Sequence, residues 1–197
     1  MAWIEPVELI GETVALRPLS IRHASALKEA ASDGDLCNLW YTKIPAPENV
    51  EAEIERRLAL QEAGSMLAFL VEDKQSDRVL GMTTYMNIEP QHRRLEIGST
   101  WYRASAQRTG VNTECKELLL RHAFDTLSCI AVEFRTSSFN MRSRVAIERL
   151  GAKLDGILRS HLIVEGNVLR DTYVYSIVAH EWPAVRRNLQ WLCSQHR

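Results

Sequence analysis

The segment from Gln107 to Asn112, QRTGVN, has the residue types of a loop that binds phosphate. Strand-forming residues end just before it at Tyr102, and a helix is expected to begin just after it, near Thr113. A glycine such as Gly110 lets the backbone approach a ligand closely, and the start of a helix directs free N–H groups and a positive dipole end into the loop. The segment therefore predicts a phosphate or pyrophosphate site. The alternative is an ordinary strand-to-helix connection in which the glycine only makes the turn.

Two side chains are candidates for a general base. Glu96 lies on the strand that precedes the loop. A carboxylate partly desolvated beside a cleft can have a raised pKa and accept a proton from an amine, directly or through water. The alternative for Glu96 is a sheet residue paired with a cation such as Arg93 or Arg94. His161, on a later strand, is the second candidate because imidazole titrates near neutral pH, although a strand histidine exposed to solvent needs no catalytic role.

The periodicity of apolar residues places these side chains in a series of strands and helices. Strands are predicted over 12–19, 66–72, 78–88, 93–102, 130–135, 159–164 and 168–177, the last two joined as a β-hairpin. Helices are predicted over about 20–31, 48–63, 113–126, 142–150 and 183–193. Gly98, inside the fourth strand, indicates a bulge or a close backbone approach. One mixed α/β sheet with helices on both faces accounts for this order.

Composition favours one globular domain spanning 1–197, with a core over about 12–178 and a C-terminal helix within 180–194. The chain is 46% hydrophobic and 25% charged, and its formal net charge of −1 argues against a dedicated nucleic-acid binder. No apolar run reaches the length of a membrane span and the first residues lack the regions of a signal peptide, so we expect a cytoplasmic protein. Cys37, Cys115, Cys129 and Cys193 show no Cys-x-x-Cys spacing, so neither a zinc site nor a disulfide framework is expected, and no metal is implied.

Three features taken together resemble the GNAT N-acetyltransferases, over about residues 14–177. They are the loop, whose family pattern is Gln/Arg-x-x-Gly-x-Gly/Ala, the strand that carries Glu96, and the run Asn140-x-x-Ser143-Arg144, which opens a helix closed by Gly151. Asn112 stands at the last small position of the loop pattern. The arrangement is similar to the RimJ/RimL-type branch, whose members acetylate protein N-termini and small amines. The resemblance implies a mixed, mostly antiparallel sheet, split between its central strands to form the acetyl-CoA cleft.

The resemblance also implies the reaction and its residues. An acetyl group would pass from acetyl-CoA to a primary amine, either a protein N-terminus or a small-molecule amine, by direct attack in a ternary complex. Glu96 matches the strand position of the catalytic carboxylate in histone-type members, and a backbone N–H in the range Ser99–Tyr102 would bind the thioester oxygen. The implied cofactor-binding residues are Trp101, Tyr102, Gln107, Arg108, Thr109, Gly110, Val111, Asn112, Thr113, Asn140, Ser143 and Arg144.

The leaving thiolate needs a proton donor. Many family members supply a tyrosine from the helix after the asparagine, but the segment Arg142–Arg149 contains none. Ser143 is therefore the candidate acid, as a serine is proposed to be in RimL-like proteins. Its alternative role, compatible with the first, is to cap the helix.

The acceptor amine is expected to enter from the other side of the cleft, between the first two helices and the late hairpin. The candidate substrate residues there are Trp40, Tyr41, His161, Asp171 and Tyr173. Trp182 and Trp191 are candidates for core packing or for contacts in a homodimer. Two alternatives to the enzyme stay open: a catalytically weak CoA-binding protein that regulates or scaffolds, and an unrelated α/β phosphate-binding domain.

Overall fold

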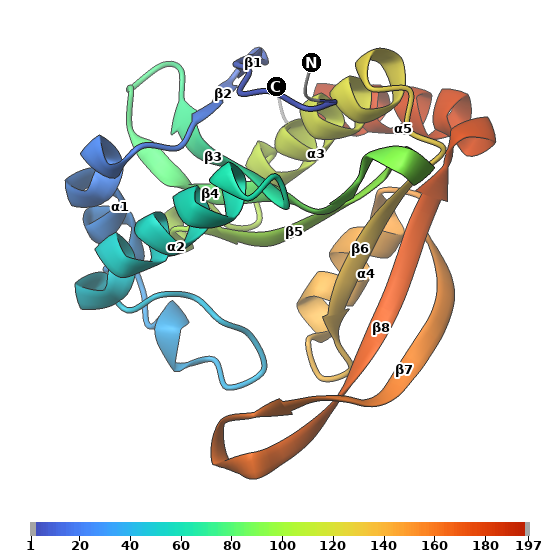
Figure 1. The fold of residues 1–197 in the computed structure, drawn as a ribbon. Helices are drawn as coiled ribbons and strands as arrows, with labels where there is room; N and C mark the ends of the chain where they lie inside the picture. The colour runs from blue at the N-terminus through green and yellow to red at the C-terminus, as the bar shows by residue number, and fades with distance from the viewer. Residues whose placement is uncertain (1–2, 196–197) are drawn as a thin grey trace.

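The computed structural model describes residues 3–195, which contain one eight-stranded sheet with helices on both faces (Figure 1). The strand order is β1-β2-β3-β4-β5-β6-β8-β7, and neighbouring strands are antiparallel except β5 and β6, which are parallel. The strands are β1 (Leu9–Ile10), β2 (Val14–Pro18), β3 (Met66–Asp73), β4 (Val79–Glu89), β5 (Arg94–Tyr102), β6 (Ala131–Ser137), β7 (Lys153–Val164) and β8 (Val168–Val178). The predicted mixed, mostly antiparallel sheet is confirmed.

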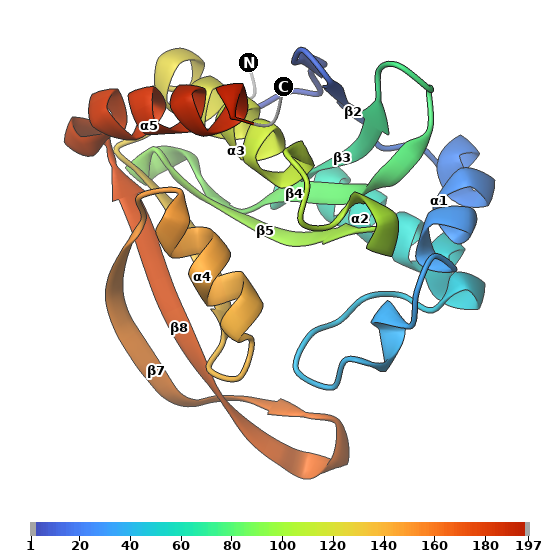
Figure 2. The ribbon, with the colours of Figure 1, turned by 180° about the vertical axis from the view of Figure 1, so that it is seen from behind.

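The helices form a layer on each side of the sheet. They are α1 (Ala24–Ala31), α2 (Val50–Glu62), α3 (Val111–Arg121), α4 (Met141–Arg149) and α5 (Trp182–Ser194). Helices α1 and α2 cover one face of β3, β4 and β5 (Figure 1), whereas α3, α4 and α5 lie on the opposite side of the sheet (Figure 2). Buried side chains accordingly form two clusters, one beneath α3, α4 and α5 and the other beneath α1 and α2.

The apolar patterns of the sequence account for these layers. The first six residues of β3, from Met66 to Val71, are apolar and all are buried, because helices cover both faces of that strand. In β6, Val132 and Phe134 pack into the cluster beneath α4, while Glu133 and Arg135 alternate with them and face the other way. Helices therefore cover both faces of the sheet at β3 but only one face, that of α4, at β6.

The central strands β5 and β6 pair only at their beginnings. The register joins Arg94 to Ala131, Leu95 to Val132 and Glu96 to Glu133. Beyond those residues β5 continues to Tyr102 and β6 to Ser137 without pairing with each other, and the two strands diverge (Figure 1). Glu96 is thus the last residue of β5 that pairs with β6, at the point where the sheet splits.

β5 also contains a bulge, directly after Gly98. Thr84 of β4 pairs with Gly98 and Met82 pairs with Trp101, so two residues of β5 lie opposite one residue of β4. The first of the two, Ser99, has a left-handed backbone with φ 47°. An extra residue of this kind interrupts the ladder and turns its peptide groups out of the regular pattern. The bulge predicted from the glycine is confirmed.

β7 is longer and more irregular than predicted. It begins at Lys153 rather than near residue 159, and it forms the edge of the sheet beside β8. Register shifts between Leu154 and Gly156, and again between Leu158 and Leu162, interrupt its pairing. These shifts disturb the two-residue alternation by which a strand is identified, so the first half of β7 could not be found from the sequence.

Two other boundaries differ from the prediction. Helix α3 begins at Val111, two residues before the predicted start at Thr113, so Asn112 lies in the helix rather than in the loop. The short strand β1 was not predicted, because two residues are too few to show a period. Among residues 3–195, none of the helices has both the length and the apolar character that crossing a membrane requires.

Candidate active site

The predicted phosphate loop joins the end of β5 to the first turn of α3. Gly110 directly precedes the helix and offers no side chain to cap it. The hydroxyl of Thr109 accepts one N–H, from Val111 at 3.3 Å, so the following N–H groups of the first turn are directed into the loop. Arg108 carries the left-handed backbone of the loop, with φ 62°, whereas Gly110 has an ordinary helical φ of −67°. The glycine therefore serves here by lacking a side chain, not by its backbone conformation.

Two side chains of the loop fix its path. The Nε2 of Gln107 donates to the Tyr102 carbonyl at 3.1 Å, and the hydroxyl of Thr109 donates to the Ala106 carbonyl at 2.7 Å. Arg108 and Thr109 are exposed. Gln107 thus ties the loop back to the last residue of β5, and Arg108 is free to meet a ligand from solvent.

An arginine that the sequence did not single out lies at the same helix end. Arg149, in the last turn of α4, donates from Nη2 to the hydroxyl of Thr113 at 2.5 Å. It thereby adds a positive charge beside the first turn of α3, where the helix dipole already favours an anion. Sequence reasoning missed Arg149 because a basic residue in the last turn of a helix is expected on dipole grounds alone.

Glu96 is a buried carboxylate at the split. Leu95 and Ile97 pack beneath α3, so Glu96, between them, points to the opposite face. It is 5% exposed, and its Oε2 accepts from Asn87 Nδ2 at 2.7 Å and lies 3.6 Å from Arg135 Nε. Burial raises the pKa of Glu96, while Asn87 and Arg135 oppose the rise. These are properties of a general base poised above the usual carboxylate range.

Gly98 leaves the space that the Glu96 carboxylate occupies. A Cβ at position 98 would lie 2.9 Å from Glu96 Oε1 and 2.8 Å from Met86 Sδ, closer than such contacts occur. The cation beside Glu96 is Arg135 of β6, so the predicted pairing of Glu96 with a cation is met by an arginine other than Arg93 or Arg94. Arg94 instead pairs with Glu133, at 2.5 Å.

A second arginine approaches Glu96 from β8. The Nε of Arg170 is buried and makes no hydrogen bond with any residue between 3 and 195. Burial lowers the pKa of Arg170, and the charge of Glu96 opposes that change. A buried donor without a partner costs about 1–3 kcal/mol, so Arg170 is a candidate contact for an oxygen of a bound substrate. Nothing in the sequence around Arg170 distinguishes it from a surface arginine.

The N-cap of helix α4 is Asn140, not Ser143, for which the sequence suggested a capping role. Asn140 is the N-cap of α4, and its Oδ1 accepts the backbone N–H of Ser143 at 3.1 Å. The expectation that Ser143 caps this helix is therefore wrong. Its half-buried hydroxyl makes no hydrogen bond among the described residues, so it is available as a donor. Its role as the acid stays a prediction.

Arg144 and Tyr173, predicted for the cofactor and the acceptor respectively, contact each other. The guanidinium of Arg144 lies 4.0 Å from the centre of the Tyr173 ring, and its Nε donates to the Tyr175 hydroxyl at 3.2 Å. Tyr175 in turn donates to Glu148 at 2.8 Å. These contacts place Tyr173 on the α4 side of the sheet, opposite to the side of Glu96. Arg144 holds α4 against β8, and any contact with a phosphate must come from the rest of its guanidinium.

Trp101 and Tyr102 are core residues. Trp101 is 3% exposed and packs beneath α1 and α2, whereas Tyr102 is 8% exposed and packs beneath α3. Their side chains therefore do not line the loop. Only their backbone groups can contribute to a cofactor site.

The predicted acceptor residues do not form a single cluster. Trp40 is exposed and packs against Phe139 at 5.2 Å, which joins the α1–α2 loop to the β6–α4 loop, and it meets Tyr41 edge-on at 5.9 Å. His161, exposed on β7, lies 3.1 Å from the hydroxyl of Thr172 through its Nδ1.

Asp171 has a structural role in the hairpin. Its carboxylate accepts the Ser160 N–H at 2.7 Å and the Arg159 Nε at 2.8 Å. Ser160 has a left-handed backbone, with φ 50°. Asp171 therefore stabilises an irregular point of β7, and its contact with an acceptor stays a prediction.

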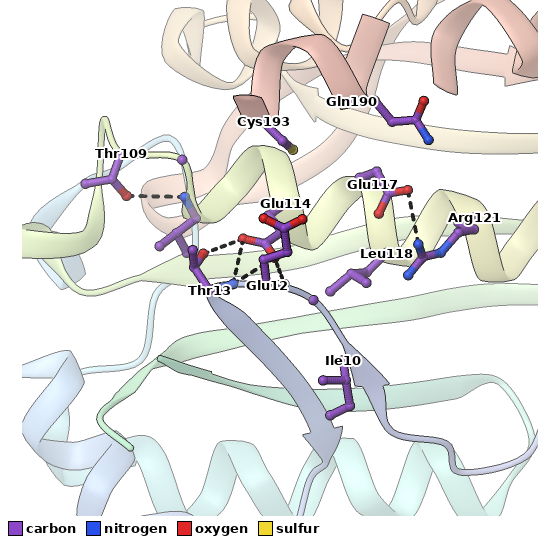
Figure 3. A pocket seen from close by; sticks show the side chains of 13 residues that line it. Ile10, Glu12, Thr13, Thr109, Glu114, Glu117, Leu118, Arg121, Gln190 and Cys193 are labelled. Carbon is purple, nitrogen blue, oxygen red and sulfur yellow. Dashed lines mark hydrogen bonds and ion pairs between the residues drawn. The ribbon is translucent and has the colours of Figure 1, made fainter. Parts of the chain in front are cut away.

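A cavity of about 670 Å³ lies on the other flank of α3, between that helix, α5 and the β1–β2 turn (Figure 3). Glu12, Glu114 and Glu117 line it beside the loop residue Gly110. Glu114 accepts the Thr13 N–H at 3.0 Å, so it also holds the turn in place. Arg121 also lines the cavity and pairs with Glu117 at 3.6 Å, so three carboxylates and one guanidinium face it. The remaining negative charge repels a polyphosphate, which makes this cavity a poor site for the cofactor.

The C-terminal tryptophans have different environments. Trp182 is buried, stacks on Phe124 at 5.2 Å and donates to Asp125 at 2.7 Å, so it belongs to the core. Trp191 is 60% exposed, and its part in a homodimer stays a prediction. Within residues 3–195 no two of the cysteines form a disulfide, and no three His, Cys, Asp or Glu side chains are grouped to hold a metal ion.

Residues 13–153 match the family model described as an acetyltransferase (GNAT) domain. Among curated proteins, YdaF of Bacillus subtilis, which carries the name of a ribosomal N-acetyltransferase, is 30% identical over 102 residues. The match covers 52% of this chain and 55% of that protein, so it spans about half the length of this relative.

Solved structures share the fold over nearly the whole chain. A GCN5-related N-acetyltransferase from Brucella melitensis is 31% identical with a TM-score of 0.86, over 96% of this chain and 86% of that one. RimJ of Mycobacterium smegmatis, solved in complex with a CoA disulfide, is 24% identical with a TM-score of 0.76, over 93% of this chain and 90% of that one. The likeness to RimJ concerns the fold.

Proposed function

Because the chain belongs to the GNAT acetyltransferase family, consistent with its RimJ/RimL-type branch, we propose that this acyltransferase transfers the acetyl group of acetyl-CoA to a primary amine. The observation that carries the proposal is the place of Glu96. It is a buried carboxylate where β5 and β6 separate, on the strand that leads into the phosphate loop. The acceptor is a protein N-terminus or a small-molecule amine.

The loop and the first turn of α3 would hold the pyrophosphate of acetyl-CoA. Backbone N–H groups from Arg108 to Thr113 supply donors, and Arg108 and Arg149 supply positive charge. The pantetheine arm would lie between β5 and β6, where neither strand pairs with the other. In this position the thioester reaches the level of Glu96 from the α3 side of the sheet.

The chemistry then needs one base, one oxyanion donor and one acid. Glu96 removes a proton from the amine, whose nitrogen forms a bond to the thioester carbon. A backbone N–H of the β5 bulge stabilises the oxygen as it gains charge. The carbon–sulfur bond breaks as the hydroxyl of Ser143 donates a proton to the thiolate. Ser143 then regains a proton from water, and Glu96 returns to water the proton that it took from the amine. The raised pKa of Glu96 supports the first step, because it brings the carboxylate closer to the pKa of an amine.

The charges around Glu96 restrict the acceptor. Arg135 lies within 3.6 Å of its carboxylate, and Arg170 presents a buried donor nearby. Arg135 is also paired with Glu133, at 2.9 Å, so Arg170 is the one of the two with a donor that has no partner among the described residues. That donor favours an acceptor that carries an oxygen near its amine, such as the carbonyl of a peptide N-terminus or the carboxylate of an amino acid.

Binding of acetyl-CoA, CoA and ATP, measured side by side by calorimetry, tests the cofactor assignment. We expect acetyl-CoA and CoA to bind and ATP to bind much more weakly. Gly110→Trp should abolish binding of the first two, since the large side chain fills the loop. Equal binding of ATP would indicate a general phosphate-binding domain, and CoA binding without transfer to any free amine would indicate a scaffold protein.

Glu96→Gln tests the base. We expect its kcat to fall by a factor of about 10²–10⁴ while its affinity for acetyl-CoA is unchanged. In the unsubstituted protein the rate should rise with pH as Glu96 loses its proton, at a pKa above the usual 4.5, and this limb should be missing in the variant. Release of CoA thiol with a panel of free-N-terminus peptides and amines gives the rates.

Glu72→Gln is the matched control, because Glu72 is also a strand carboxylate bound to an arginine, Arg17 at 2.5 Å. It should retain kcat and the pH limb. A Glu96→Gln variant with an unchanged pH–rate profile would remove Glu96 as the base.

A further inference from the structure

Arg57 is the largest side chain among those fully buried, and the reaction as described does not use it. It lies on α2 and is 2% exposed. The apolar residues Val50 and Ile54, at a spacing of four and then three positions before it, face the sheet in the same stripe. A guanidinium therefore stands where a helix of this pattern ordinarily presents an apolar residue, and burial lowers its pKa.

All three kinds of nitrogen in the Arg57 guanidinium are engaged. The Nε donates to Glu53 Oε1 at 2.7 Å, Nη1 donates to the Thr84 hydroxyl at 2.6 Å, and Nη2 donates to the Ser99 carbonyl at 3.0 Å. Glu53 neutralises the charge, and Thr84 and Ser99 fix the plane of the group. Burying an ion in this way costs several kcal/mol before its bonds form, so these contacts, rather than general stability, account for an arginine here.

The contact with Ser99 acts on the β5 bulge. The left-handed backbone of Ser99 turns its carbonyl out of the β4–β5 ladder and towards α2, where Arg57 receives it. The same peptide group contains the N–H of Thr100. Because a trans peptide is planar, with its C=O and N–H on opposite sides, that N–H points away from α2. Without Arg57, the Ser99 carbonyl would lose this hydrogen bond, and the peptide would no longer be held in one orientation.

We infer that Arg57 is a positioning residue for acetyl transfer, which fixes the Ser99–Thr100 peptide so that the Thr100 N–H faces the thioester oxygen. The inference rests on the proposed function for its role in the rate. The fixed N–H also affects binding before any reaction takes place. It distinguishes acetyl-CoA, which has the thioester carbonyl, from CoA, which lacks it.

Arg57→Lys is the main test, since it keeps the charge and the salt bridge with Glu53 but loses the fork that reaches Thr84 and Ser99 together. We expect kcat to fall at least tenfold, with the KM for the amine nearly unchanged. Calorimetry should show the affinity for CoA unchanged within about twofold and the preference for acetyl-CoA over CoA reduced. The pH limb of Glu96 should stay in place.

Arg56→Lys is the matched control. Arg56 is the adjacent residue of α2 and also binds Glu53, through Nε at 2.8 Å and Nη2 at 2.9 Å, but it is half-exposed and within residues 3–195 forms no hydrogen bond or ion pair with β5. It should leave kcat and both affinities unchanged. Thr84→Val, which removes one of the partners that set the Arg57 plane, should change kcat in the same direction as Arg57→Lys, and it provides a second variant if Arg57→Lys does not fold.

An unchanged kcat in a folded Arg57→Lys variant would overturn the inference. So would an equal loss of affinity for acetyl-CoA and CoA together with a lower Tm, because that result describes a purely structural arginine. If the unsubstituted protein bound acetyl-CoA but acetylated no amine, the proposed function would fail on its own. The ratio of acetyl-CoA to CoA affinity would still decide the role of Arg57.

Discussion

Glu96, Arg57 and Lys116 are three of the buried ionisable side chains, and they lie in or beside the central strands, where apolar residues would be cheaper to bury. Glu96 is held by Asn87 and Arg135, and Arg57 has hydrogen-bond partners for all of its nitrogens. Lys116 differs from both. Its hydrogen-bond partners are neutral hydroxyl groups, so no opposite charge offsets the free-energy cost of burying its ammonium group.

Lys116 reaches from α3 to the sheet. Its Nζ donates to the Thr100 hydroxyl at 2.8 Å and to the Thr83 hydroxyl at 3.3 Å, and these two hydroxyls lie 2.7 Å apart. Burial lowers the pKa of Lys116 from 10.5 to about 8. Keeping this ammonium charged at neutral pH therefore costs about 3 kcal/mol of folding free energy.

Lys116→Met should raise stability at pH 6–7, because it removes the buried charge while the two threonines keep their mutual hydrogen bond. The folded pKa is below the unfolded one, so the penalty is full below pH 8 and disappears above 10.5. The gain in Tm should therefore shrink as the pH rises through this range. Thermal melts from pH 6 to 10 check this, and a gain independent of pH would show that packing, not charge, had changed.

At the residue scale the sequence identified Glu96 by its place before the loop. The structure shows that Glu96 is buried and lies where β5 and β6 separate. It did not identify Arg57, Arg149 or Arg170. Each of them interacts with a partner that is distant in the chain, Ser99, Thr113 and Glu96 respectively. Local pattern contains no signal for such contacts, and an arginine on a helix or strand is ordinarily a surface residue.

At the scale of elements, the start of α4 separates two roles that the sequence could not separate. Asn140 caps the helix, and Ser143 lies inside it with its hydroxyl free among the described residues. An Asn at one position and a Ser three residues later both suit a cap. Only the geometry shows which oxygen accepts the N–H.

Asn140→Ala should lower the free energy of unfolding by about 1 kcal/mol, because the first turn of α4 loses the oxygen that accepts the Ser143 N–H. Ser143→Ala should leave stability nearly unchanged and lower kcat. Denaturant titrations and thiol-release rates on both variants measure the two effects. If Ser143→Ala destabilised the protein as much as Asn140→Ala and left kcat intact, Ser143 would be a structural residue and the acid would have to be sought elsewhere.

The long periodic elements were predicted well and the irregular ones were not. Helix α2 and strand β3 match their apolar patterns closely. The first half of β7 was missed because its register shifts remove the alternation, and the start of α3 was misplaced by two residues because the Asn112 side chain suits a loop as well as a first turn. Failures of this kind occur where the backbone departs from a regular period.

At the scale of the whole molecule, the two halves of the sheet are joined by three residue pairs between β5 and β6. The aromatic contact of Trp40 with Phe139 adds a second link across the opening. A ligand lying in the split would touch both halves and stabilise them together. At a ligand concentration of 100 Kd this stabilisation is about 2.7 kcal/mol.

Hydrogen exchange checks this coupling. With saturating acetyl-CoA, amides of β4 and β5 and amides of β6 and β8 should slow together, by about 100-fold for those that exchange through global unfolding. ATP at the same concentration is the control and should slow few of them. Protection restricted to the loop and α3 would place the ligand on the surface of one half and contradict the proposed position of the pantetheine arm.

The irregularity of β7 has a consequence for the behaviour of the protein at high concentration. β7 is a long edge strand, and the hairpin that it forms with β8 exposes apolar side chains, among them Ile163 at 69% and Leu169 at 60%. A flat edge of this length and composition would template pairing with another chain. The two register shifts and the left-handed Ser160 bend the edge and break its row of hydrogen-bonding groups. The distortion that hid the first half of this strand from sequence analysis thus also protects its edge against pairing with another chain.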